Sequence, residues 1–330
     1  MRKLYFLLPG TDNKFACGGL WAELKTLELA RNICNADVVT YRQRESGKLF
    51  LDDILSEKQE DTIFVMSWGF DISRLVSKLR GQNVVYHAHS AGYKFNLPPD
   101  IPIITVSRNT LGYWGQLAPN SLIYYLPNQI SEEFQNLHLP RDIDILVQAR
   151  KSSTYLLKML VPALQKKYQV FVVNSYIPDL PGLFNRAKVY LYDSAEYWAQ
   201  QSVSEGFGLQ PMEAMACGCH VFSSVNGGLS DYLDPGFNCQ KIAGYSLEYD
   251  MQRISVALNR ENKITFPEHF LAEYRQKNII DKMQVILQEL NEFFDHRQKY
   301  TSNIPQLTPM RLAQLQIQRV FSKVKKKMNR

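Results

Sequence analysis

The sequence of 330 residues is poor in cysteine, contains no long apolar run and has no acidic residue beyond Asp295. Its five cysteines are odd in number and show no C-x-x-C spacing, so neither a disulfide framework nor a zinc site is expected. The N-terminal apolar run, Leu4–Leu8, is too short for a signal-peptide core, and no stretch is long enough to cross a membrane. These absences favour a reducing compartment, and we expect a cytoplasmic protein.

Length and charge divide the chain into a body and a tail. A chain of this length predicts two domains, and 45% hydrophobic residues suffice for two cores. The net charge is +6, but nine Lys or Arg residues and no acid follow Asp295, so residues 1–295 carry a net charge of −3. The body is therefore slightly acidic and the tail strongly basic.

The first half of the chain alternates short apolar strands with helical stretches, which is typical of an α/β domain with a parallel sheet. Gly18 and Gly19 follow the first strand and open a helix, so the backbone there can approach a ligand at the carboxyl edge of the sheet. A plain flexible turn would look the same. The expected strands are Lys3–Leu8, Asp37–Thr40, Thr62–Met66, Asn83–His87 and Ile103–Val106.

A second α/β unit begins with the strand Asp144–Ala149, which is followed by Arg150, Lys151 and a helix that Ser152 or Ser153 can cap. Cations at a helix N-terminus oppose the helix dipole, so this pair predicts an anion nearby. The next strands are Val170–Val173 and Ala187–Tyr192, and residues 247–259 and 267–294 have helical periodicity.

The most informative stretch is a glycine-rich turn that leads into a helix predicted over Leu209–Cys217. Gly206 and Gly208 remove Cβ atoms just before the helix begins, so free amides and the positive end of the dipole face a guest that should be an anion. Glu205 and Glu213 frame the turn and are expected to accept hydrogen bonds from hydroxyl groups. A sugar nucleotide offers both a diphosphate and hydroxyl groups. An ordinary buried helix with a glycine-rich entry is the structural alternative.

Ten positions in this turn and helix together resemble the E-x7-E signature of retaining glycosyltransferases of family 4. The resemblance implies that Glu205 lies by the donor sugar and that Glu213 binds the ribose. It also implies the GT-B fold, an α/β architecture of two Rossmann-like domains that face a cleft. The matching residues are Glu205, Gly206, Phe207, Gly208, Leu209, Glu213, Ala214, Met215, Ala216 and Gly218.

The resemblance assigns further roles along the chain. It places His89 at the donor sugar, Arg150 at the diphosphate, and Gly227 and Gly228 along the donor site. The usual Lys five residues after the Arg is replaced by Tyr155, so we expect Lys151 to substitute. Other departures are Gln129, where the family has Gly, and His220, where it has Pro.

No metal site is predicted. His87 and His89 are two residues apart on a strand end, but no third ligand lies nearby in the sequence, and we read His87 as structural. The D-x-D pattern Asp142-Ile143-Asp144 precedes a strand, at the edge of the sheet away from ligands, and is expected to face solvent.

The expected function is transfer of a hexose, with retention, from a UDP- or GDP-sugar to a glycan or glycolipid acceptor, independent of metal and of any cofactor. Two rivals stay open: a nucleotide-sugar epimerase of the same fold and a non-catalytic partner in polysaccharide assembly. The expected parts are an acceptor-side domain (1–135), a nucleotide-sugar-binding domain (136–300) and a basic amphipathic helix (301–330).

The tail has its own pattern. Thr308-Pro309 starts a helix in which apolar residues recur every three or four positions, with seven Lys or Arg residues between 311 and 330. Such a helix over residues 308–330 can dock on anionic lipid at the inner face of the membrane. Alternatively, its apolar stripe packs across the domains. Nothing in the pattern indicates nucleic-acid binding.

Overall fold

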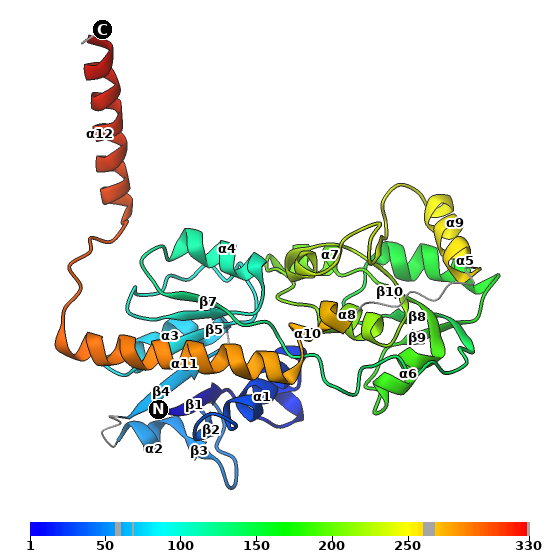
Figure 1. The fold of residues 1–330 in the computed structure, drawn as a ribbon, viewed down its shortest axis with the longest axis horizontal. Helices are drawn as coiled ribbons and strands as arrows, with labels where there is room; N and C mark the ends of the chain where they lie inside the picture. The colour runs from blue at the N-terminus through cyan, green and yellow to red at the C-terminus, as the bar shows by residue number, and fades with distance from the viewer. Residues whose placement is uncertain (57–60, 68, 260–267, 329–330) are drawn as a thin grey trace.

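The computed structural model describes residues 1–330 except 57–60, 68, 260–267 and 329–330. Two parallel sheets lie side by side along the longest axis, each covered by helices on both faces (Figure 1). This confirms the prediction of two α/β domains.

The first domain contains a seven-stranded sheet in the order β3-β2-β1-β4-β5-β6-β7, in which all pairs are parallel. The strands are β1 (Lys3–Leu8), β2 (Ala36–Thr40), β3 (Leu49–Phe50), β4 (Thr62–Met66), β5 (Val84–Ala88), β6 (Ile103–Thr105) and β7 (Ile123–Tyr125). The helices are α1 (Gly18–Ala30), α2 (Leu51–Leu55), α3 (Ile72–Lys78) and α4 (Arg108–Leu117). The strand order reverses between β1 and β4, which is where such sheets bind ligands.

The second domain contains a five-stranded parallel sheet in the order β12-β11-β10-β8-β9. The strands are β8 (Ile143–Gln148), β9 (Val170–Val173), β10 (Ala187–Tyr192), β11 (His220–Ser223) and β12 (Gln240–Lys241). The helices are a π-helical turn (Leu156–Leu160), α5 (Val161–Gln165), α6 (Leu180–Arg186), α7 (Ala195–Gln201), α8 (Leu209–Ala216), α9 (Leu247–Leu258) and α10 (Glu268–Ala272). The order reverses at β8 and β10, so Arg150 and Lys151 follow a strand at the switch point.

The single helix predicted over 267–294 is two helices, α10 and α11 (Gln276–Lys299); residue 267 lies outside the described residues. The break places Arg275 against the chain that links the domains. Its guanidinium donates to the carbonyl oxygens of Ser131 at 2.7 Å and Phe134 at 2.9 Å. This side chain therefore ties the break between the two helices to the linker.

Helix α11 returns to the first domain, as Figure 1 shows. Its buried residues pack with β1, β4 and α1 in one core, and Arg2 donates to Asn291 and Asp295 on it. The expected assignment of all residues up to 300 to the second domain therefore needs correction at this helix. An apolar helical face packs on whichever sheet face is open, and its periodicity does not say which.

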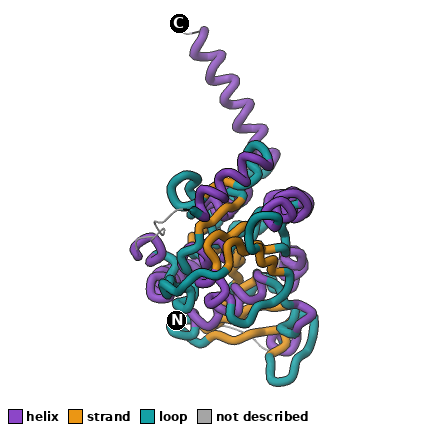
Figure 2. Tube along the Cα trace, turned by 90° about the vertical axis from the view of Figure 1, so that its right-hand side faces the viewer, coloured by secondary structure: helices purple, strands orange, loops and turns teal. Residues whose placement is uncertain are grey.

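Helix α12 (Pro309–Met328) stands away from both domains at the end of an extended segment, as both views show (Figures 1 and 2). Its described apolar side chains are exposed, including Met310 at 75% and Phe321 at 70%. The alternative that its apolar stripe packs across the domains is therefore wrong. Among the described residues, no helix is long and apolar enough to span a bilayer.

Candidate active site at the domain junction

The glycine-rich turn lies where the two domains meet. It joins α7 to α8, and Gly208 stands at the start of α8 with φ +76°, a conformation that favours glycine. Gly208 has no side chain with which to cap this helix end. The amides of Leu209 and Gln210 begin the helix, and Pro211 has no amide to offer.

Two loops, at His89 and at Gly228, pack backbone to backbone against this turn, and glycine permits each contact. A Cβ on Gly206 would stand 2.6 Å from the carbonyl carbon of His89, closer than real Cβ atoms come. A Cβ on Gly228 would overlap the carbonyl of Gly206, and the Gly228 amide donates to the Glu205 carbonyl at 2.7 Å. These glycines therefore serve loop packing. The predicted role of Gly206, Gly227 and Gly228 at a donor remains a prediction.

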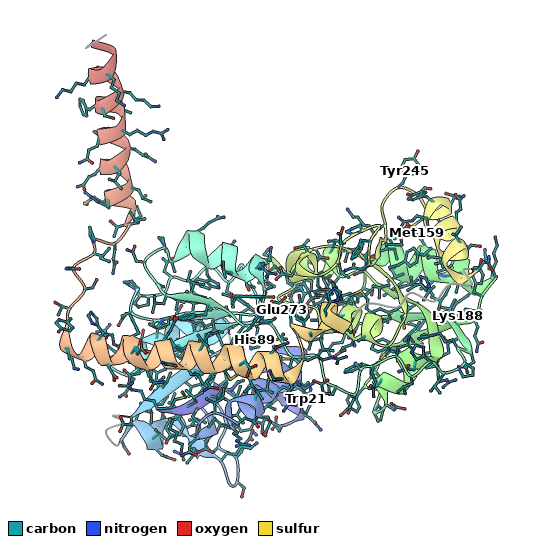
Figure 3. All side chains as sticks on the ribbon, viewed as in Figure 1. Trp21, His89, Met159, Lys188, Tyr245 and Glu273 are labelled. Carbon is teal, nitrogen blue, oxygen red and sulfur yellow. The ribbon has the colours of Figure 1, made fainter. Side chains whose placement is uncertain are left out.

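Direct hydrogen bonds hold the first domain to this turn. The Ser204 amide donates to the Ala91 carbonyl at 2.9 Å, and the Ser90 hydroxyl donates to the Ser204 carbonyl at 2.5 Å. His89 is therefore placed beside the turn, and Figure 3 shows it in the middle of the molecule.

A second link joins Asp231 of the second domain to α4 of the first. Its carboxylate accepts from the amides of Arg108 at 2.5 Å and Asn109 at 3.3 Å, in the first turn of the helix. Burial raises the pKa of Asp231, while these amides favour its charged form. The charge suits the positive end of the helix dipole.

Glu205 is buried and held by two donors of its own domain. Its Oε2 accepts from the Tyr192 hydroxyl at 2.6 Å and from the Trp198 indole at 2.7 Å. Burial and the neighbouring Glu205 raise the pKa of Tyr192, so this hydroxyl keeps its proton. Oε1 has no hydrogen-bond partner in the part of the chain that the structure describes.

Glu213 is also buried but has no hydrogen-bond partner among the described residues. Burial raises the pKa of this carboxyl to about 7, although the charge of Lys25 on α1 acts in the opposite direction. Because burying an unpaired carboxylate is costly, a ligand with hydroxyl groups would be a favourable partner for it.

Arg150 and Lys151 occupy different surroundings. The Arg150 side chain is exposed and makes no ion pair within the described ranges. Lys151, at φ +66°, places its Nζ 4.3 Å from the ring centre of Trp198, the residue that donates to Glu205. The Trp198 side chain therefore contacts both Lys151 and Glu205.

The N-terminus of the helix after β8 contacts an acidic side chain, while the anion predicted at Arg150 and Lys151 remains a prediction. Glu196 of α7 accepts from the Thr154 amide at 2.9 Å and from its hydroxyl at 2.8 Å, and these bonds lower the pKa of Glu196. Tyr155, at the position of the family's Lys, donates its hydroxyl to the buried Asp250 at 2.7 Å. Tyr155 thus belongs to the core of the second domain.

Gly18 and Gly19 begin α1 beside open space. A Cβ on Gly18 would meet nothing within 4 Å, and one on Gly19 would meet only the Cys17 sulfur at 3.9 Å. The protein's own packing therefore does not require glycine here, and the predicted role of the pair in ligand binding is untested.

Glu23 is the partner of His87 and His89 that the sequence did not reveal. One oxygen of this carboxylate lies 2.6 Å from His87 Nδ1 and 2.7 Å from His89 Nε2. These three side chains have a geometry that could hold a metal ion. The D-x-D carboxylates are instead paired with Arg186 and Lys188 away from this junction, as expected for a solvent-facing edge.

The sequence reading missed four other residues of this junction. Tyr192 and Trp198 hold Glu205, Glu196 caps the helix after β8, and Asp231 caps α4. Only Glu23 carried a sequence signal: it lies three residues after Leu20 and four before Leu27 on a buried helix face, where an acid needs partners.

Comparison with known proteins identifies the class of fold. Residues 150–260 match the family model described as Glycosyl transferases group 1. Sucrose-phosphate synthase from Thermosynechococcus elongatus superposes with a TM-score of 0.60 at 14% identity, over 88% of this chain and 100% of that one. A glycosyltransferase from Rickettsia africae superposes with a TM-score of 0.59 at 11% identity, over 89% and 98%.

A third structure with this likeness is HepE of Anabaena in complex with UDP and glucose, with a TM-score of 0.56 at 14% identity, over 91% of this chain and 100% of that one. The search of curated proteins found no match. At these identities the likeness establishes the fold, which is the GT-B fold of glycosyltransferases.

Proposed function

We propose that this chain is a retaining glycosyltransferase that moves a hexose from a nucleotide diphosphate sugar to a hydroxyl group of a glycan or glycolipid acceptor, without a metal ion. The family match and the GT-B fold support a transferase that uses a nucleotide sugar, and HepE, which shares the fold, was solved with UDP and glucose. The observation that carries the proposal is that the turn with Glu205 and Glu213 lies at the domain junction beside His89.

In this proposal the diphosphate lies at the start of α8, between the free amides there and Arg150. Negative charge develops on the leaving phosphate as the glycosidic bond to it breaks, so cations and amides aimed at it stabilise the transition state. Arg150 suits this role because its guanidinium is exposed and not already paired within the described residues. Lys151, whose ammonium group lies over the Trp198 ring, adds a second positive charge to the diphosphate site in this proposal.

The two carboxylates contact the sugars. Tyr192 and Trp198 fix one oxygen of Glu205, which leaves Oε1 to accept from a hydroxyl of the hexose. The unpartnered carboxylate of Glu213 accepts from the ribose hydroxyls. His89 contacts the donor sugar from the first domain. The donor is therefore bound by residues of both domains.

Incubation of the full chain with UDP-, GDP- and dTDP-sugars, with and without glycan acceptors, tests the proposal. Without acceptor, a transferase would hydrolyse one of the donors slowly. With the right acceptor, it would transfer the sugar faster and retain the anomeric configuration. An epimerase would convert the donor sugar without acceptor. No turnover of any donor, with normal folding, would favour a non-catalytic role and contradict the proposal.

We further propose that α12 docks on anionic lipid at the inner face of the membrane. Five of its exposed apolar side chains form a stripe with no protein partner among the described residues, and the helix has basic residues but no acid. Apolar stripe and basic flanks together match the chemistry of an interfacial helix on anionic headgroups. The stripe consists of Met310, Ile317, Val320, Phe321 and Val324, whereas Leu312 and Leu315 are exposed on the opposite side of the helix.

A further inference from the structure

Phe70 is an aromatic side chain that the fold holds in solvent, beyond the carboxyl end of β4. It lies in the short 3-10 helix Gly69–Asp71 between β4 and α3, and it is 80% exposed. Its ring meets the ring of Tyr93 edge to face, with 5.2 Å between the ring centres. Gly69 permits this contact, because a Cβ there would lie 2.6 Å from the Tyr93 ring.

Asp71 fixes the backbone on the other side of Phe70. Its carboxylate is buried and accepts hydrogen bonds from the Tyr41 hydroxyl and from the Arg42 guanidinium, each at 2.7 Å. Arg74 lies 3.8 Å from the same carboxylate. Because both neighbours of Phe70 are held, its ring cannot turn into the core without breaking these contacts. The ring is therefore presented to solvent on a fixed support, as aromatic anchors of binding surfaces are.

Tyr93 places this pair of rings at the domain junction. It follows Gly92, where a Cβ would stand 2.6 Å from the carbonyl oxygen of Ser202 in the second domain. Burial raises the pKa of Tyr93, and Cys17 of the first domain and Tyr197 of the second lie close enough to raise it further. The Tyr93 ring therefore lies between the start of α1 and helix α7.

Aromatic rings continue from Tyr93 to Glu205. Tyr197 contacts Trp198 edge to face, with 5.1 Å between the ring centres, and the Trp198 indole donates to Glu205 at 2.7 Å. Phe70 and Tyr93 thus form the first-domain end of a row of rings whose other end holds the carboxylate proposed to bind the donor sugar. A ligand on Phe70 would lie on the acceptor side of that sugar.

The surroundings of Phe70 combine an apolar ring with hydrogen-bond donors. The side chains of Arg42 and Arg74 are 43% and 61% exposed, so N–H groups that do not face Asp71 can donate to a ligand. A sugar ring matches both features, because it has C–H groups on its faces and hydroxyls on its rim, and the face of an aromatic ring is electron-rich and attracts such C–H groups. A hydrocarbon chain would remove water from the two guanidinium groups and offer them no acceptor.

We propose that Phe70 and Tyr93 form a platform for a sugar ring of the acceptor, so that this chain transfers to a sugar hydroxyl and not to a hydroxyl of a simple lipid or a protein. The sugar stacks on the Phe70 ring, and Arg42 and Arg74 donate to its oxygens. The assignment of this sugar as the acceptor rests on the proposed function, whereas the binding of a sugar at Phe70 does not.

Sugar binding is tested first, without any donor. The labelled full chain is applied to a glycan array at a series of concentrations. The wild type should bind a group of glycans that share a sugar, and Phe70→Ala should bind them about 10-fold more weakly or worse. Phe70→Trp, which keeps an aromatic face, should retain binding. Phe237→Ala removes a phenyl ring that is 75% exposed in the second domain and is the matched control. Equal binding by the wild type and Phe70→Ala, or no binding by the wild type, would overturn the proposal.

The second test measures transfer to a glycan that the array identifies. Phe70→Ala should raise the KM for this acceptor about 10-fold, while donor hydrolysis without acceptor and the melting temperature stay the same, because the ring is exposed and lies outside the proposed donor site. An unchanged acceptor KM in Phe70→Ala would refute the platform and leave the proposed function intact. Glycan binding that depends on Phe70 without transfer from any donor would support the platform and contradict the proposed function.

Discussion

The carbonyl group of His89 occupies the space that any side chain at Gly206 would need. These residues come from different domains, and their backbones are in direct contact at the glycine-rich turn. The absence of a Cβ at 206 is thus a condition for the first domain to reach the turn. Because the turn carries Glu205 and the strand end carries His89, this one contact sets the spacing of the two groups proposed to hold the donor sugar.

Gly206→Ala should therefore separate the domains at the junction. A methyl group there forces a backbone shift, because the atoms that it would meet belong to the backbone of His89 and not to a flexible side chain. We expect turnover to fall by about 10²-fold, because displacements near 1 Å have effects of this size, and the free energy of unfolding to drop by about 1–3 kcal/mol. Gly112→Ala in α4, where a Cβ meets nothing within 4 Å, is the control and should leave both unchanged or raise stability slightly. Wild-type turnover in Gly206→Ala would show that this spacing is unimportant.

Arg150→Ala should separate catalysis from folding. The side chain makes no ion pair among the described residues, so the melting temperature should stay the same. Loss of its charge at the leaving phosphate should lower kcat by about 10² to 10³, or roughly 3–4 kcal/mol. Arg80→Ala, which removes an exposed arginine of the other domain, is the matched control. Near-normal turnover in Arg150→Ala would remove this residue from the mechanism.

Glu213 should make the protein less stable as pH rises. Its folded pKa of about 7 exceeds the ordinary value of 4.5, so below pH 4.5 both states hold the proton and burial has no ionic cost. Between pH 4.5 and 7 the unfolded chain releases the proton first, and the free energy of unfolding should fall by roughly 3 kcal/mol, with no further change above pH 7.

Urea unfolding of the wild type and Glu213→Gln between pH 4 and 8 measures this contribution. The difference between the two proteins isolates Glu213, because other titrating groups are common to both. We expect the glutamine variant to lose the decline in this window. Parallel stability curves for the two proteins would mean that the Glu213 carboxyl titrates normally.

Removal of residues 306–330 should abolish binding to vesicles that contain phosphatidylglycerol and leave donor hydrolysis unchanged. Binding should weaken with salt, since each basic residue near an anionic surface contributes about 1 kcal/mol. Phe321→Glu places a charge in the apolar stripe, while Ser322→Glu adds the same charge on the next residue, away from it. The first should reduce binding much more than the second. Equal effects, or binding that survives the deletion, would contradict docking through this stripe.

The sequence predicted the sheets well because buried parallel strands are continuous apolar runs with few other interpretations. Thr62–Met66, Val170–Val173 and Ala187–Tyr192 are strands over the predicted bounds. It did not predict that α11 packs on the first domain, since an amphipathic helix shows which of its faces is buried and not which sheet covers it.

The turn proposed as the donor site could be located from the sequence, but its partners could not. The signature turn is local, so its residues could be read in order. The partners of that turn come from distant segments: Trp198 and Tyr192 for Glu205, and Asp231 for α4. Contacts of this kind depend on where loops end after folding, and a single sequence carries no spacing rule for them.

The most direct test of the central claim is a crystal structure of the full chain with UDP or GDP, whichever nucleotide its sugar donor carries. We expect the diphosphate at the start of α8 with Arg150 beside it, and the ribose hydroxyls within hydrogen-bond distance of Glu213. A nucleotide bound elsewhere, or bound at the junction with Glu213 still without contact to it, would contradict the account.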